Sequence, residues 1–93
     1  TPSPVIEGNR AVAVGLADGP LAGLAILDRV LAAGDLADYA PLHTAHADLL
    51  DRAGRTDEAT AAWARAIETT DNDTLRDSLR RRVAERDSPP QAG

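Results

Sequence analysis

Apolar side chains recur three or four positions apart along most of the chain, and no segment alternates apolar and polar residues with a period of two. The first spacing is that of an amphipathic helix, whereas the second would indicate a strand. The pattern therefore predicts an all-α domain. We expect five helices, over about 4–17, 20–33, 41–53, 57–70 and 73–86.

Residues that start or stop helices set these boundaries. Ser3-Pro4 supplies an N-cap and a proline at the first helical position, and Asp18-Gly19-Pro20 ends one helix and begins the next. Gly34 and Gly54 follow apolar stripes, at helix ends where a left-handed residue is favoured. Thr56 is the expected N-cap of the fourth helix. Because the connections inside the first and second helix pairs are short, each pair is predicted to form an antiparallel hairpin.

The apolar stripes predict which helix faces are buried. The expected faces are Val5, Ile6, Val12, Ala13, Leu16 and Ala17 on the first helix, and Leu24, Leu27 and Leu31 on the second. On the third they are Leu42, His46, Leu49 and Ala53, with Leu50 alongside. The fourth presents Ala59, Ala62, Trp63, Ala66 and Ile67, and the fifth Leu75, Leu79 and Val83. A short loop containing Leu36 and Tyr39 separates the two hairpins.

Asn9 is the polar residue that this pattern places on the core side of the first helix, between Val5 and Val12. A buried amide without a hydrogen-bond partner costs on the order of 1–3 kcal/mol. Two interpretations stay open. Asn9 either joins the first helix to a loop backbone from inside the core, or lines a concave groove and binds the backbone of an extended peptide.

The composition predicts a core of small side chains and excludes several kinds of site. The chain has no Phe, Met or Cys, and its 93 residues include 19 alanines. Small side chains let helices approach closely, and the lack of cysteine excludes disulfides and thiolate metal sites. The net charge of −5 argues against binding to phosphate backbones.

We find no membrane span or signal peptide, and expect one soluble, cytoplasmic domain over 1–87 with a disordered tail over 88–93. Because the first residue is Thr1 and not Met, we expect an excised or processed domain.

The second hairpin follows the tetratricopeptide pattern, with small residues where helices cross and bulky residues between them. The first hairpin matches it more loosely. It places Gly23 and Leu27 where the second has Ala59 and Trp63, an offset of 36 residues. The predicted fold is therefore a tetratricopeptide-like helical repeat, with two antiparallel hairpins and a C-terminal capping helix.

Nearly the whole chain resembles the C-terminal extension of a group of extracytoplasmic-function RNA polymerase sigma factors. The matching positions are Ser3-Pro4, Glu7, Asn9-Arg10-Ala11-Val12-Ala13, Asp18-Gly19-Pro20, Gly23-Leu24, Tyr39, His43, Ala47-Asp48-Leu49-Leu50, Arg52, Gly54-Arg55, Glu58-Ala59, Ala66 and Arg82. The resemblance implies a regulatory domain that modulates transcription initiation. Its implied partners are the upstream sigma-factor domains, RNA polymerase or a regulatory protein, and the promoter-reading helices lie outside these residues. The alternative is a free-standing tetratricopeptide adaptor that binds a peptide of a partner protein.

His43 and His46, with Asp48, are the residues that could indicate a metal site or a general base. Histidines three apart lie near one helix face, but the known metal motifs need more ligands at fixed spacing. No serine, threonine or cysteine is placed beside them as a nucleophile. We therefore predict no enzyme activity, no metal, no cofactor and no small-molecule substrate.

Protein contact is the remaining role for the polar positions. Arg10 can pair with Glu7, three residues before it, and Arg55 can bond the last carbonyls of the preceding helix. Residues 76–87 carry 5 arginines and 3 acids in an otherwise acidic chain, which favours a solvated face or a docking edge over a nucleic-acid patch. The candidate contact residues are Asn9, Arg10, Tyr39, His43, His46, Arg80, Arg81 and Arg82.

Overall fold

The computed structural model describes residues 4–34 and 39–87, which form five α-helices and no strand. The helices are α1 (Pro4–Asp18), α2 (Pro20–Ala33), α3 (Ala40–Arg52), α4 (Thr56–Thr69) and α5 (Asp73–Asp87). The predicted all-α class is confirmed, and every boundary lies within one residue of the sequence-based expectation. The expected N-cap Ser3, the loop residue Leu36 and the tail over 88–93 lie outside the described residues.

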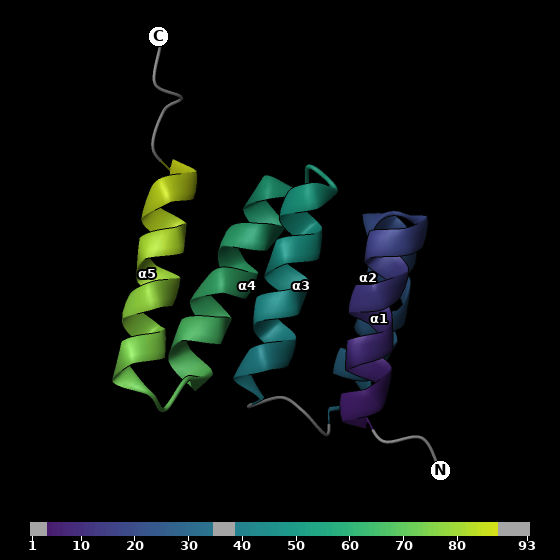
Figure 1. The fold of residues 1–93 in the computed structure, drawn as a ribbon, viewed down its shortest axis with the longest axis horizontal. Coiled ribbons are helices and arrows are strands. Elements are labelled where there is room, and N and C mark those ends of the chain that lie inside the picture. The colour runs from purple at the N-terminus through teal and green to yellow at the C-terminus, as the bar shows by residue number, and fades with distance from the viewer. Residues whose placement is uncertain (1–3, 35–38, 88–93) are drawn as a thin grey trace, which may run out of the picture.

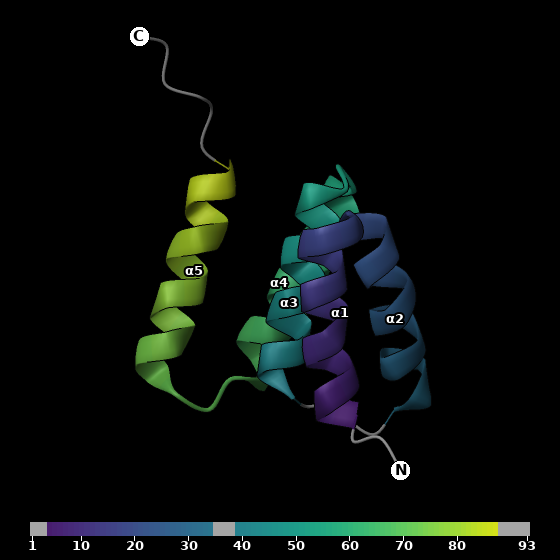
Figure 2. The same cartoon turned by 45° about the vertical axis from the view of Figure 1, so that its right-hand side comes forward.

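The helices stand in a row that begins with the α1–α2 hairpin and ends with α5 (Figures 1 and 2). The second hairpin, α3–α4, occupies the middle: α3 packs against both α1 and α2, and α4 packs against α5. This arrangement of neighbouring helix pairs is that of a short helical repeat. Because α3 contacts both helices of the first hairpin, it is the structural centre of the domain.

The turn between α3 and α4 forms a hydrogen-bonded cap around Gly54. Gly54 has φ 79°, its amide bonds the carbonyl of Asp51 at 3.0 Å, and the Arg55 amide bonds the carbonyl of Leu50 at 2.9 Å. This pair of bonds is the Schellman motif, and the predicted left-handed residue is confirmed. The predicted N-cap Thr56 is wrong: Arg55 is the N-cap, without a side-chain cap bond. The motif brings the chain directly into α4, so that Thr56 is already helical.

The core is built from α2, α3 and α4, with Trp63 as its largest member. Trp63 is 1% exposed, and alanines of α4 lie beside it at helical spacing. The buried apolar residues are Ala11, Leu24, Ile26, Leu27, Ala40, Leu42, Ala47, Leu49, Leu50, Ala59, Ala62, Trp63, Ala66 and Leu79. The expected inner faces of α2 and α4 are largely confirmed, whereas α5 buries only Leu79 among residues 73–86.

The predicted inner face of α1 is only partly confirmed: Val5 and Val12 are half-buried, whereas Ile6, Leu16 and Asn9 are exposed. The buried face of α1 consists instead of small residues, Gly8, Ala11 and Gly15. A Cβ atom on Gly8 would lie 2.7 Å from Leu42 Cδ1, and one on Gly15 would lie 2.6 Å from Leu49 Cδ2. The two leucines of α3 thus fill the space that the glycines of α1 leave open, which turns the larger apolar residues of α1 outward.

None of the helices in the described parts of the chain is long and apolar enough to cross a membrane.

Candidate functional site

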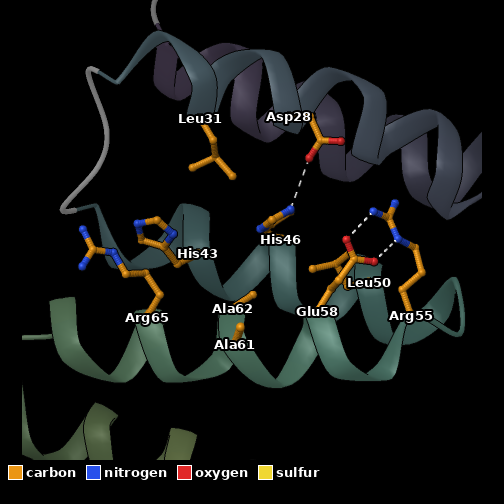
Figure 3. Close-up of a pocket in the computed structure, with 10 residues that line it drawn as sticks. All are labelled: Asp28, Leu31, His43, His46, Leu50, Arg55, Glu58, Ala61, Ala62 and Arg65. Carbon is orange, nitrogen blue, oxygen red and sulfur yellow. Dashed lines mark hydrogen bonds and ion pairs between the residues drawn. The ribbon is translucent and has the colours of Figure 1, made fainter.

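A groove runs between α2 and α4, with α3 lying between these two helices (Figure 3). Its volume is about 610 Å³. It is lined by Asp28 and Leu31 of α2, by His43, His46 and Leu50 of α3, by Glu58, Ala61, Ala62 and Arg65 of α4, and by Arg55. No residue of α5 lines it, so this groove is not filled by the last helix.

Helical spacing explains why these side chains share one groove. Those of α3 are three and four residues apart, and those of α4 follow the same rule from Glu58 to Arg65. Each helix therefore presents a single face to the groove. Because α2 belongs to the first hairpin and α3 and α4 to the second, the groove exists only where the two hairpins pack together.

His46 joins the two hairpins across the middle of the groove, where its Nε2 lies 3.3 Å from Oδ1 of Asp28. Burial lowers the pKa of His46 below its ordinary value of 6.5, and the charge and hydrogen bond of Asp28 only partly offset this effect. Nearby His43 and Arg55 lower that pKa further. His46 is therefore a neutral imidazole near pH 7 that titrates in the acidic range.

Charged side chains mark the two ends of the groove (Figure 3). At one end, Arg55 donates two hydrogen bonds to Glu58, of 2.5 Å from Nε to Oε2 and 2.7 Å from Nη2 to Oε1. The hydrogen bonds from Arg55 lower the pKa of the Glu58 carboxyl, so Glu58 is ionised at neutral pH. At the other end lie His43 and Arg65, and Arg65 also pairs with Glu68.

This arrangement suits the binding of a polypeptide segment. Leu31, Leu50 and the two alanines of α4 offer an apolar base, and the charged ends can fix the direction and register of a bound chain. Among residues 4–34 and 39–87, no group of three or more His, Cys, Asp or Glu side chains is placed to hold a metal ion. The groove offers shape, apolar contact and a few polar anchors to a bound segment.

The structure divides the predicted contact residues among four places. His43 and His46 lie in the groove. Asn9 and Tyr39 line a separate cavity of about 30 Å³ between α1 and α3, which is large enough for a water molecule and too small for a peptide. Arg10 is exposed and pairs with Glu7 at 3.4 Å, as its spacing predicted.

Arg80, Arg81 and Arg82 lie on α5, away from the groove and exposed. The Arg82 guanidinium lies over the Trp63 ring, with Cζ 4.6 Å from the ring centroid. Arg55 bonds a carbonyl of the last turn of α3, that of Leu50, as expected, but through its backbone amide, while its side chain binds Glu58.

Sequence reasoning missed Asp28, Glu58 and Arg65 as groove residues. The spacing of Glu58 and Arg65 on one face of α4 was a visible signal, since seven residues make two helical turns. Asp28 had no comparable signal, because its position opposite His46 depends on how the two hairpins pack.

Comparison with known proteins gives one relative and no family. No family model matches the chain, and no solved structure matches it. An uncharacterized protein of Rhizobium meliloti (strain 1021) is 42% identical over 72 residues, which are 76% of this chain and 16% of that protein. The chain therefore spans about a sixth of the length of this relative, in which the similar region is one part of a much longer protein.

Proposed function

We propose that this chain is a regulatory protein-contact domain of an extracytoplasmic-function RNA polymerase sigma factor, acting in the cytoplasm. It modulates transcription initiation by binding a segment of the sigma core, of RNA polymerase or of a regulatory protein. The resemblance of nearly the whole chain to the C-terminal extension of such factors supports this proposal. The length of the Rhizobium relative is consistent with a module inside a larger protein.

The groove between the hairpins is the observation that carries the proposal. Its apolar base has the character of a peptide-binding surface, and its two ends carry charged residues from different elements. Helical arrays of this kind bind through shape and a few polar anchors without chemistry of their own. A segment bound here would contact both hairpins at once, so binding and the packing of the hairpins would be coupled.

The test is to fill the groove without disturbing the core. Ala61 lines the groove but is itself exposed, so Ala61→Arg places a long side chain in the groove at little cost to folding. Ala64 is an exposed residue of the same helix outside the groove, and Ala64→Arg is the matched control. Both variants are made in the full-length protein and compared by in vitro transcription from the cognate promoter with purified polymerase.

We expect Ala61→Arg to change transcript yield at least about tenfold, the effect of losing roughly 1.4 kcal/mol of contact energy, and Ala64→Arg to leave it unchanged. Equal yields from both variants would contradict a contact through the groove. The DNA upstream of the codon for Thr1 is a separate test. Promoter-reading helices are expected there, and a start codon at that place would contradict the sigma-factor assignment.

A further inference from the structure

A second polar surface lies on the opposite side of the α3–α4 hairpin from the groove, under α5. It consists of Asp48 and Asp51 of α3 together with Thr60 and Trp63 of α4, and we name it the Asp–Trp face. The Trp63 ring is buried, and its Nε1 donates a hydrogen bond of 2.9 Å to Oδ2 of Asp51. This bond fixes the Asp51 carboxylate at the junction of the two helices.

Two arginines of α5, one helical turn apart, occupy the Asp–Trp face. Arg86 binds Asp51 through one edge of its guanidinium in a bidentate pair, at 2.6 Å from Nε to Oδ2 and 2.8 Å from Nη2 to Oδ1. Its Nη1 also donates to the Thr60 hydroxyl at 3.3 Å. Arg82 lies over the Trp63 ring, 4.6 Å from its centroid, and 3.7 Å from the Asp48 carboxylate. A planar guanidinium suits a fixed carboxylate and an aromatic ring better than an ammonium group does.

The rest of α5 contributes little to its attachment. Leu79 is the only buried residue among 73–86, whereas α2 and α4 each bury four. Val83 is partly buried, and Leu75 is exposed. The helix is therefore held mainly by Leu79, Val83 and the two arginines, with a further hydrogen bond from Arg76 to the Thr70 carbonyl. The arginine contacts are partly open to solvent and weakened by salt.

We propose that the Asp–Trp face is a binding site for an arginine-bearing helix of a partner protein, and that α5 occupies it as an internal competitor. The side chains that α5 places there define the partner: a leucine, an arginine three residues later and a second arginine four residues after that, as in Leu79, Arg82 and Arg86. Charge complementarity favours such a partner, because residues 1–75 carry 12 acids and 5 arginines. This surface is separate from the groove, so its role does not depend on the function proposed above.

The test uses a fluorescently labelled peptide with the sequence of residues 73–87 and the intact 93-residue chain, with binding followed by fluorescence anisotropy. Arg86→Ala in the chain loosens its own α5 and leaves the Asp–Trp face complete. We expect this variant to bind the peptide at least about tenfold more tightly than the unmodified chain, because the internal competitor is weakened. Arg81→Ala, on the exposed side of the same helix, should bind the peptide like the unmodified chain.

Adding Asp51→Asn to Arg86→Ala removes the carboxylate, and we expect it to reverse the gain. A peptide in which both arginines are replaced by alanine should not bind any variant. Far-UV circular dichroism of each variant establishes that the helices are intact, and Trp63 emission reports directly on occupation of the face. The groove variant Ala61→Arg should bind the peptide normally, which separates this test from that of the proposed function.

Equal peptide affinity for the unmodified chain, Arg86→Ala and the Asp51→Asn double variant would overturn the proposal. So would a dimer that forms as the concentration of Arg86→Ala is raised, measured by light scattering. In that case the occupant of the face would be α5 of a second copy and not a helix of a partner.

Discussion

The two hairpins of this domain share one register but place different residues where their helices cross. Shifted by 36 residues, α3 and α4 begin where α1 and α2 begin, and both Gly23 and its counterpart Ala59 are buried at a crossing. In the first hairpin, glycines bring the two backbones together: a Cβ on Gly23 would lie 2.6 Å from the Ala11 carbonyl oxygen. In the second, the crossing residue is the buried Ala59, and Trp63 is buried at the position that Leu27 has in the first.

The same register also shows that burial depends on the place of a residue in the row. Leu42 of α3 is 3% exposed because it packs against Gly8 of α1. Its counterpart in the first hairpin, Ile6, is 62% exposed, because no described helix lies beyond α1. Equivalent positions in the two hairpins thus have the same place on their helices but different exposure. The exposure of each position is set by the helix that packs next to it.

Removing the largest side chain of the second hairpin should produce the largest effect on stability. Trp63→Ala deletes a buried ring and leaves Asp51 without its indole donor, so we expect a loss of about 3–5 kcal/mol in the free energy of unfolding. The counterpart Leu27→Ala should cost about 2–5 kcal/mol, at the lower end of that range, since a smaller volume is removed. Urea unfolding followed by circular dichroism at 222 nm measures both. If Leu27→Ala cost more than Trp63→Ala, the first hairpin and not the second would be the stability centre.

Replacing the crossing glycine of the first hairpin should test how closely the α1 and α2 backbones approach. Gly23→Ala gains about 1 kcal/mol of helix propensity but forces a methyl group into the α1 backbone, so we expect a net loss of about 1–3 kcal/mol. Ala25 lies two residues away on the exposed side of α2, and Ala25→Gly is the control that measures propensity alone, at about 1 kcal/mol. The same urea titrations measure both changes. A chain stabilised by Gly23→Ala would show that the hairpin can open without cost, contrary to the close backbone contact.

The helices themselves could be predicted from the sequence because their boundaries are local. Gly19, Gly34 and Gly54 have positive φ in the structure, and each ends or separates helices at the position where the sequence places it. A proline at a first turn and a glycine at a last turn act within a few residues, without help from the fold. The exception at Thr56 has a local cause as well: the turn at Gly54 leads directly into α4, so Arg55 is the N-cap and Thr56 is already helical.

Contacts between helices were predicted less well, for two physical reasons. The small-residue face of α1, with Gly8 and Gly15, carries no apolar signal, so periodicity favoured the larger residues that the structure exposes. The charged contacts depend on helix packing: Asp51 and Arg86 are 35 residues apart, and only the docking of α5 brings them together. The same holds for Asp28 and His46 in the groove.

Asp51 gives the second hairpin a polar link that the first lacks, because its counterpart is Gly15. Burial raises the pKa of Asp51, but the hydrogen bonds from Arg86 and Trp63 outweigh it and hold the pKa below the ordinary value of 3.8. Between these two pKa values the folded chain binds fewer protons than the unfolded chain, so the free energy of unfolding falls as the pH falls. The stabilisation is complete above the ordinary value and is lost as the pH drops through the lowered one.

Asp51→Asn should therefore flatten the acid limb of the stability curve. At pH 7 we expect it to cost about 1–3 kcal/mol, the range for a hydrogen bond to a charged group, and to cost progressively less as the pH is lowered below 3.8. Thermal unfolding at a series of pH values measures this difference. A loss that stayed constant down to the lowest pH would mean that the carboxylate charge makes no contribution.

The smallest effect concerns His46, whose counterpart in the first hairpin is the exposed Arg10. Burial lowers the pKa of His46, so between the lowered value and 6.5 the unfolded chain binds more protons than the folded one. Stability should therefore rise with pH across this window, and His46→Gln should remove the rise.

Asp28 raises the pKa of His46, so Asp28→Asn should lower that pKa further and steepen the dependence of stability on pH. NMR titration of the His46 imidazole carbons measures this midpoint in both chains. A midpoint of His46 that did not move in Asp28→Asn would show that the carboxylate does not act on the imidazole across the hairpin junction, and the polar link between the hairpins would then have to be assigned elsewhere.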